Sequence, residues 1–131
     1  MAQLCTQLGY PTTATAVRQR LTQMQPQANY AVFVAECHDI GVIGWVHAHL
    51  TQLVQADLQV EIGGLVVDAN YRGSGIGRQL LLQVEQWAKQ QGCKSIYVRS
   101  NIIREQAHVF YEKLGYSYVK TSLAFCKILR A

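Results

Sequence analysis

Residues 65–78 read Leu65-Val66-Val67-Asp68-Ala69-Asn70-Tyr71-Arg72-Gly73-Ser74-Gly75-Ile76-Gly77-Arg78, an apolar run that enters a glycine-dense turn. The periodic apolar residues that follow predict a long amphipathic helix starting at this turn. A helix N-terminus presents unpaired N–H groups with a partial positive charge, and glycines let phosphate oxygens approach the backbone. Because Arg72 and Arg78 add charge beside the turn, the segment predicts a pyrophosphate-binding site.

The spacing of the glycines narrows the choice of pyrophosphate ligand. A Walker loop requires GxxxxGK[ST], and the turn has no such lysine. A dinucleotide fingerprint requires GxGxxG and an acidic residue about 20 residues later. Here the glycines run GxGxG, and nothing acidic lies near positions 95–100. Taken alone, the motif leaves open that these glycines only form a tight turn.

Three strands are expected ahead of the turn, at residues 30–37, 42–50 and 58–67, where β-branched, aromatic and apolar residues concentrate. Their connections are too short for helical crossovers, so the three strands should be antiparallel. Two helices should precede them, the second capped by Thr12 or Thr13.

Beyond the turn the pattern alternates between helix and strand. The helix that starts there should end at Gly92, followed by a strand at 94–100, a helix at 104–114 and strands at 116–120 and 123–129. This order predicts an α/β fold with a mixed, mostly antiparallel central sheet and helices on both faces.

Length and composition indicate one globular domain, residues 1–131. Half of the residues are apolar and 15% are charged. No apolar run approaches the roughly 20 residues that span a bilayer, so we expect no membrane partner. The four cysteines form neither a CxxC pair nor a zinc spacing. We therefore expect reduced thiols, no metal site and a cytoplasmic protein.

The net charge of +4 is unevenly distributed. Residues 1–65 hold two basic and four acidic side chains, whereas residues 66–131 hold ten and four. A basic second half suits a polyanionic ligand, although a solvated surface would look the same. The basic residues form no run and have no interleaved aromatics, so nucleic acid is not favoured as a partner.

Two motifs resemble those of the GNAT acetyltransferase superfamily. The turn segment Arg72-Gly73-Ser74-Gly75-Ile76-Gly77 matches its R/Q-x-x-G-x-G/A signature. Asn101, followed by residues 107–116, resembles the second signature, an asparagine and then A-x-x-F-Y-E-K-x-G-F/Y. The resemblance covers roughly residues 30–131 and implies a GNAT-like fold and an N-acetyltransferase that uses acetyl-CoA (coenzyme A).

The resemblance also implies which residues would bind each part of acetyl-CoA. The backbone of residues 65–67 would pair with the pantetheine arm as an added strand, and residues 72–78 would wrap the pyrophosphate. The strands ending at Val67 and Ser100 would splay apart around the thioester. The residues implied to bind the cofactor are Leu65, Val66, Val67, Arg72, Gly73, Ser74, Gly75, Ile76, Gly77, Arg78 and Asn101.

Two side chains are candidates for moving protons. Tyr111 matches the family's tyrosine at the thioester sulfur, and a phenol is close enough in acidity to a thiol to act as general acid. The alternative for Tyr111 is a core aromatic beside Phe110. Glu61 matches a position where many family members carry a catalytic glutamate, so it is the candidate base; the alternative is a solvent-facing strand residue.

His47 and His49 share one face of their strand. Either could act as base or contact the acceptor, but ordinary strand histidines are the favoured interpretation. Cys93 and Cys126 have no basic neighbour in the sequence, so direct attack in a ternary complex is favoured over an acetyl-cysteine route.

The acceptor is the least determined part of the prediction. A small-molecule primary amine is favoured, while a protein lysine or N-terminus and a non-catalytic acyl-CoA-binding module stay open. Most family members begin with a strand before the first helix, and here that first strand is absent or trimmed away. The strand at 30–37 would then form an edge of the sheet, which a homodimer would cover.

Overall fold

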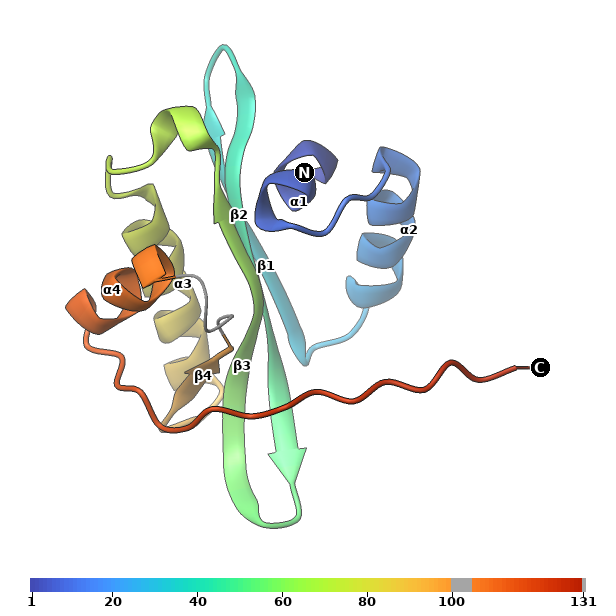
Figure 1. The fold of residues 1–131 in the computed structure, drawn as a ribbon, viewed down its shortest axis with the longest axis vertical. Helices are drawn as coiled ribbons and strands as arrows, with labels where there is room; N and C mark the ends of the chain where they lie inside the picture. The colour runs from blue at the N-terminus through green and yellow to red at the C-terminus, as the bar shows by residue number, and fades with distance from the viewer. Residues whose placement is uncertain (100–104, 131) are drawn as a thin grey trace. The chain divides into compact units, whose positions relative to one another are not determined.

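The structure is a computed structural model that describes residues 1–99 and 105–130 (Figure 1). The chain divides into two compact units, Met1–Arg99 and Ser100–Ala131. The first unit contains the whole sheet and the glycine-rich turn, and the second contains one helix and the C-terminal segment. A single domain over residues 1–131 stays a prediction.

Two helices open the chain, as the sequence predicts. Helix α1 (Ala2–Leu8) ends at Gly9, whose φ of 102° lies in the left-handed region that glycine tolerates best. Helix α2 (Ala14–Met24) is capped by Thr13, whose hydroxyl oxygen accepts a hydrogen bond from the Ala16 N–H at 3.1 Å. The cap is therefore Thr13 and not its neighbour. No strand precedes α1 in the described chain.

A four-stranded sheet follows in the order β1-β2-β3-β4. Strands β1 (Tyr30–Cys37), β2 (Gly41–Leu53) and β3 (Ala56–Val67) are antiparallel, which confirms the prediction, although β2 and β3 are longer than predicted. Strand β4 (Ile96–Val98) runs parallel to β3 and is shorter than predicted, since Lys94 lies in a bend. Strand β1 is an outer strand, and a second copy covering it stays a prediction.

Helices pack on both faces of the sheet. Successive residues of β2 point to opposite faces, so neighbouring residues contact helices on different faces. A side chain at Gly44 would meet Ile76 and Leu80 of helix α3 (Ile76–Gln90). The next residue, Trp45, packs on the other face with Leu4 of α1. The α/β fold with helices on both faces is therefore as predicted. Among the described residues, none of the helices has the length and apolar character that crossing a membrane requires.

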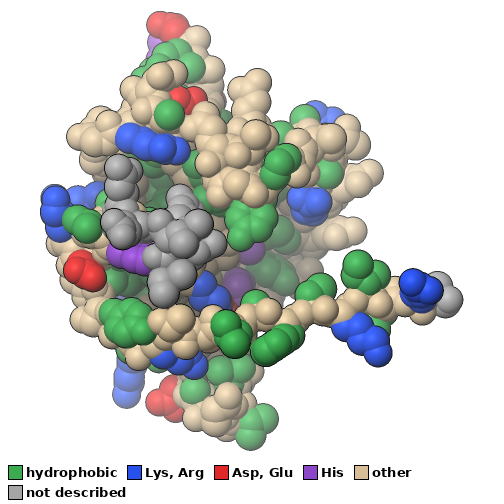
Figure 2. Space-filling view, in the orientation of Figure 1, with side chains coloured by type: hydrophobic (Ala, Val, Ile, Leu, Met, Phe, Trp, Pro, Cys, Tyr) green, Lys and Arg blue, Asp and Glu red, His purple; other side chains and the backbone are tan. Residues whose placement is uncertain are grey.

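The second unit departs from prediction. Helix α4 (Glu105–Lys113) is present, but residues 116–130 form no strand, so the strands predicted at 116–120 and 123–129 are wrong. A strand exists only when a neighbouring strand satisfies its backbone groups, and a sequence pattern does not supply that neighbour. Apolar side chains stand exposed along this segment (Figure 2), namely Tyr118, Val119, Leu123, Phe125, Ile128 and Leu129.

Candidate active site

The glycine-rich turn is built by its own hydrogen bonds. After β3 ends at Val67, the carboxylate of Asp68 accepts a hydrogen bond from the Asn70 N–H at 2.9 Å and starts a single 3-10 turn, η1 (Ala69–Tyr71). Arg72 Nε then donates to the Val67 carbonyl at 3.0 Å, and the Ser74 hydroxyl donates to the Tyr71 carbonyl at 2.5 Å. These contacts fold the chain back so that α3 begins directly after the turn.

Glycine is required at two positions of this turn. Gly73 and Gly75 have φ values of 83° and 87°, in the left-handed region where other residues are strained. A Cβ atom added at either position would meet nothing within 4 Å, so the space beside both residues is open. These glycines serve the backbone conformation, and they leave room for a ligand against it.

The N-terminus of α3 offers donors that the helix itself does not use. Gly75 is the N-cap residue and provides no side-chain cap. The first intrahelical hydrogen bond is donated by Gln79 to the Gly75 carbonyl at 3.1 Å. The N–H groups of Ile76, Gly77 and Arg78 therefore have no intrahelical acceptor, and they carry the positive end of the helix dipole. This is the chemistry that an anion such as a pyrophosphate requires.

The end of β3 leaves one backbone edge available. Residues 65–67 pair with β2 on one side, in the register Leu65 to Val46 and Val67 to Gly44. On the other side, β4 pairs with β3 only over residues 60–62. Beyond Ile62, no strand in the part of the chain that the structure describes pairs with this edge. An extended ligand could add to the sheet there, as the resemblance to the GNAT superfamily implies for pantetheine.

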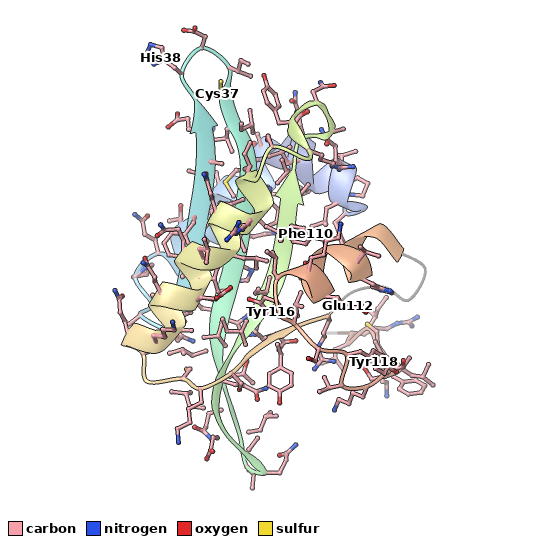
Figure 3. All side chains as sticks on the ribbon, turned by 90° about the vertical axis from the view of Figure 1, so that its left-hand side faces the viewer. Cys37, His38, Phe110, Glu112, Tyr116 and Tyr118 are labelled. Atoms are coloured by element: carbon pink, nitrogen blue, oxygen red, sulfur yellow. The ribbon has the colours of Figure 1, made fainter. Side chains whose placement is uncertain are left out.

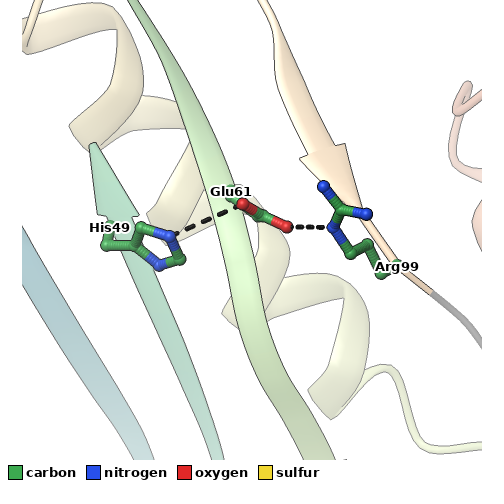
Figure 4. A network of polar contacts seen from close by, with 3 residues as sticks. All are labelled: His49, Glu61 and Arg99. Carbon is green, nitrogen blue, oxygen red and sulfur yellow. Dashed lines mark hydrogen bonds and ion pairs between the residues drawn. The ribbon is translucent and has the colours of Figure 1, made fainter. Parts of the chain in front are cut away.

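Glu61 is the middle one of the three β3 residues that pair with β4 (Figure 4). One carboxylate oxygen accepts a hydrogen bond from Arg99 Nε at 2.5 Å, and the other lies 3.6 Å from His49 Nε2. The Glu61 side chain is only 17% exposed. Glu61 is therefore not a solvent-facing strand residue, but a half-buried carboxylate held between two basic side chains.

His47 belongs to the same face of the sheet. It lies over Gly63, where an added Cβ would come within 2.7 Å of His47 Nδ1. The ring centroid of His47 is 5.7 Å from that of His49 and 5.8 Å from that of Tyr30. Burial, and secondly the neighbouring His49, lower the pKa of His47 below its ordinary value. His47 is therefore stabilised in its neutral form.

Arg99 is a site residue that the sequence analysis did not identify. A parallel register pairs Glu61 with Tyr97, so Arg99, which directly follows β4, is the next residue on the same face. The signal in the sequence is the alternation that places Arg99 two residues after Tyr97. It is usable only once the β3–β4 register is known. Among the described residues, no three His, Cys, Asp or Glu side chains cluster closely enough to hold a metal ion.

Tyr111 lies on α4 in the second unit, beside Phe110 (labelled in Figure 3). Its ring meets Phe110 edge-on at 5.3 Å between centroids and Tyr116 at 5.9 Å. These contacts hold the phenol within an aromatic cluster. Its role as a general acid stays a prediction. Asn101, the remaining predicted cofactor contact, lies outside the described residues.

Comparison with known proteins identifies relatives of this chain. Residues 4–116 match the sequence profile of the Acetyltransferase (GNAT) family. Aminoglycoside N(6')-acetyltransferase type 1 of Stenotrophomonas maltophilia is 29% identical over 111 residues, which cover 82% of this chain and 72% of the relative. Aminoalkylphosphonate N-acetyltransferase of Salmonella typhimurium is 40% identical over 76 residues, which cover 57% of this chain and about half (49%) of the relative.

Solved structures share the fold. The structure of AAC(6')-Iy in complex with the bisubstrate analogue CoA-S-monomethyl-acetylneamine superposes with a TM-score of 0.83 at 20% identity, covering 98% of this chain and 89% of that one. The aminoglycoside antibiotic 6'-N-acetyltransferase AAC(6')-Ih of Acinetobacter baumannii gives a TM-score of 0.80 at 25% identity, covering 92% and 84%.

Proposed function

Because the chain belongs to the Acetyltransferase (GNAT) family, we propose that it transfers the acetyl group of acetyl-CoA to a primary amine of a small molecule. The named relatives support this choice of acceptor, since they act on an aminoglycoside and on aminoalkylphosphonates. Acetyl-CoA supplies an activated acyl group, so no further cofactor is needed. The acceptor nitrogen attacks it directly, in a ternary complex.

One observation carries the proposal, the open N-terminus of α3. The free N–H groups of residues 76–78 bind the diphosphate, with the exposed Arg78 beside them. The edge of β3 at residues 65–67, which pairs with no described strand, holds the pantetheine arm by hydrogen bonds to backbone groups other than the Val67 carbonyl. Arg72 contributes indirectly, because its Nε is bonded to the Val67 carbonyl and holds the turn in shape. Asn101 supplies a further cofactor contact.

Proton transfer is assigned to two side chains. An alkylammonium has a pKa of about 10, so the acceptor must lose a proton before its nitrogen can attack. Glu61 takes that proton, directly or through a water, from its half-buried place beside β4. Tyr111 donates a proton to the departing thiolate.

The binding step is tested by one matched pair of substitutions. Gly75 and Gly92 lie at opposite ends of α3, both have left-handed φ values, and both face open space. Alanine at either position should lower the free energy of unfolding by about 1 kcal/mol through backbone strain. Only Gly75→Ala should weaken binding of acetyl-CoA, by about tenfold or more in isothermal titration calorimetry, because only Gly75 adjoins the free N–H groups.

A wild-type protein with no measurable affinity for acetyl-CoA would overturn the proposal. Equal losses of affinity in Gly75→Ala and Gly92→Ala would place the cofactor somewhere other than this turn. Both variants should unfold cooperatively, so that the comparison of affinities is between folded proteins.

The reaction is tested by release of the CoA thiol with aminoglycosides, aminoalkylphosphonates, a polyamine and a lysine peptide. Tyr111→Phe should lower kcat by about 100-fold or more, the usual contribution of a general acid. Tyr118→Phe is the matched control, because Tyr118 is 74% exposed. Turnover with the peptide alone would contradict the small-molecule acceptor, and binding without any turnover would contradict catalysis.

A further inference from the structure

The carboxylate of Glu61 has two neighbouring side chains, which contact it at different distances. Arg99 Nε donates to Oε1 at 2.5 Å, whereas His49 Nε2 lies 3.6 Å from Oε2. The second distance is about 0.6 Å longer than a typical hydrogen bond. Contacts of this kind in unliganded sites often shorten when the reacting complex forms. His49 lies on β2 and Arg99 directly follows β4, so the two side chains reach Glu61 from opposite sides of β3 and contact different oxygens.

The two nitrogens of His49 have unequal surroundings. Nδ1 is buried and has no hydrogen-bond partner among the described residues. A proton on Nδ1 would therefore be an unsatisfied buried donor, which a folded protein avoids. Nε2 faces the Glu61 carboxylate, an acceptor. These surroundings favour the imidazole that carries its proton on Nε2 and directs it at Glu61.

We propose that His49 is a positioning residue for Glu61: its Nε2–H donates to Oε2 and, together with Arg99, holds the carboxylate in one orientation toward the acceptor amine. This inference rests on the proposed role of Glu61 as the base. A carboxylate with a contact at each oxygen has less rotational freedom than an exposed glutamate. Fixing a catalytic group in the reactive orientation raises the rate of the reaction.

The other groups facing this pair come from β1, β2 and β4. The rings of His47 and Tyr30 lie tilted against the His49 ring, with centroids at 5.7 and 6.3 Å, and restrict its rotation. Tyr97 is the register partner of Glu61 on β4. Since burial and the neighbouring His49 lower the pKa of His47, His47 adds no competing positive charge near neutral pH. Arg99 is a cationic partner of Glu61.

The first test needs no catalysis. In proton and nitrogen-15 NMR spectra, the Nε2 proton of His49 should give a downfield signal that exchanges slowly with water. The signal should persist in Glu61→Gln, whose amide oxygen can also accept, and disappear in Glu61→Leu. The inference fails if wild-type protein lacks this signal, or if it is unchanged in Glu61→Leu.

The second test separates positioning from packing by kinetics. His49→Leu should lower kcat by about 10- to 100-fold, as removal of an orienting partner does, with the KM for acetyl-CoA unchanged. His49→Gln should restore most of kcat, because a glutamine amide places an N–H close to the position of Nε2. His38→Leu is the control, since the His38 side chain is 98% exposed.

The outcomes distinguish the positioning role of His49 from the proposed acetyl transfer. Full kcat in His49→Leu, or a kcat in His49→Gln as low as in His49→Leu, would overturn the positioning role while leaving acetyl transfer in place. Absence of turnover in the wild type with every amine would overturn the proposed function, and the NMR signal would still decide whether His49 donates to Glu61.

Discussion

Two regions are predicted to form strands, the first at residues 42–50 and 58–67 and the second at residues 116–120 and 123–129. The first region forms β2 and β3, in which Val46 is fully buried; the second forms no strand, and its Val119 is 70% exposed. β2 lies between two strands of the sheet, whereas residues 116–130 pair with no strand that the structure describes. A strand pattern therefore indicates a capacity for pairing, and a strand forms only where a partner pairs with it.

The largest expected difference between the two regions is in proteolysis. Chymotrypsin should cut after Tyr118 and Phe125 about 100-fold faster, or more, than after Phe33 or Trp45. The first two side chains are exposed on coil, whereas cutting inside β1 or β2 requires the sheet to open. Mass spectrometry of a time course measures both rates.

Slow cutting after Tyr118 would contradict the exposure of residues 116–130, because it would mean that the segment is covered in solution. If that protection disappears on dilution, the cover is a second copy of the chain. If protection is independent of protein concentration, residues 116–130 pair within their own chain.

A smaller difference is expected in stability. Val46→Ala should lower the free energy of unfolding by about 2 kcal/mol, since it removes two buried methyl groups and leaves a cavity. Val119→Ala makes the same chemical change on an exposed side chain and should alter that free energy by less than about 0.5 kcal/mol. Urea unfolding of both variants measures the values, and equal losses would contradict the assignment of residues 116–130 as exposed.

Most of the first unit is predictable because its signals are local. A threonine cap starts α2, a left-handed glycine ends α1, and short connections force β1 to β3 to be antiparallel. The glycine-rich turn is predictable for the same reason, because its conformation is set by residues within one turn of Gly75. In these regions the backbone requirement and the residue that meets it are neighbours in the chain.

The rest of the site depends on register, which no local pattern fixes. Glu61 and Arg99 are 38 residues apart and meet only because β3 and β4 pair with Glu61 opposite Tyr97. A bulge in β3 moves the register between His47 and Ala48, so that His47 pairs with Gly64 and lies over Gly63. One residue of slippage would turn Glu61 to the opposite face, which is why its partners could not be predicted from the sequence.

The smallest expected effect is on the pH dependence of stability. It arises because His47, on the paired strand β2, is partly buried. Folding lowers the pKa of His47, so the unfolded chain, with an ordinary value of about 6.5, binds a proton more readily than the folded one. Stability from this group is therefore complete above about pH 6.5 and declines as the pH falls below it, by at most about 1.4 kcal/mol per pH unit. His47→Phe should flatten this decline between pH 7.5 and 5.5 in urea unfolding, and His38→Phe, on the exposed turn, is the control. If the free energy of unfolding of His47→Phe depends on pH as that of the wild type does, this face of β2 admits a charged imidazole. The strand would then be less protected from water than its burial indicates.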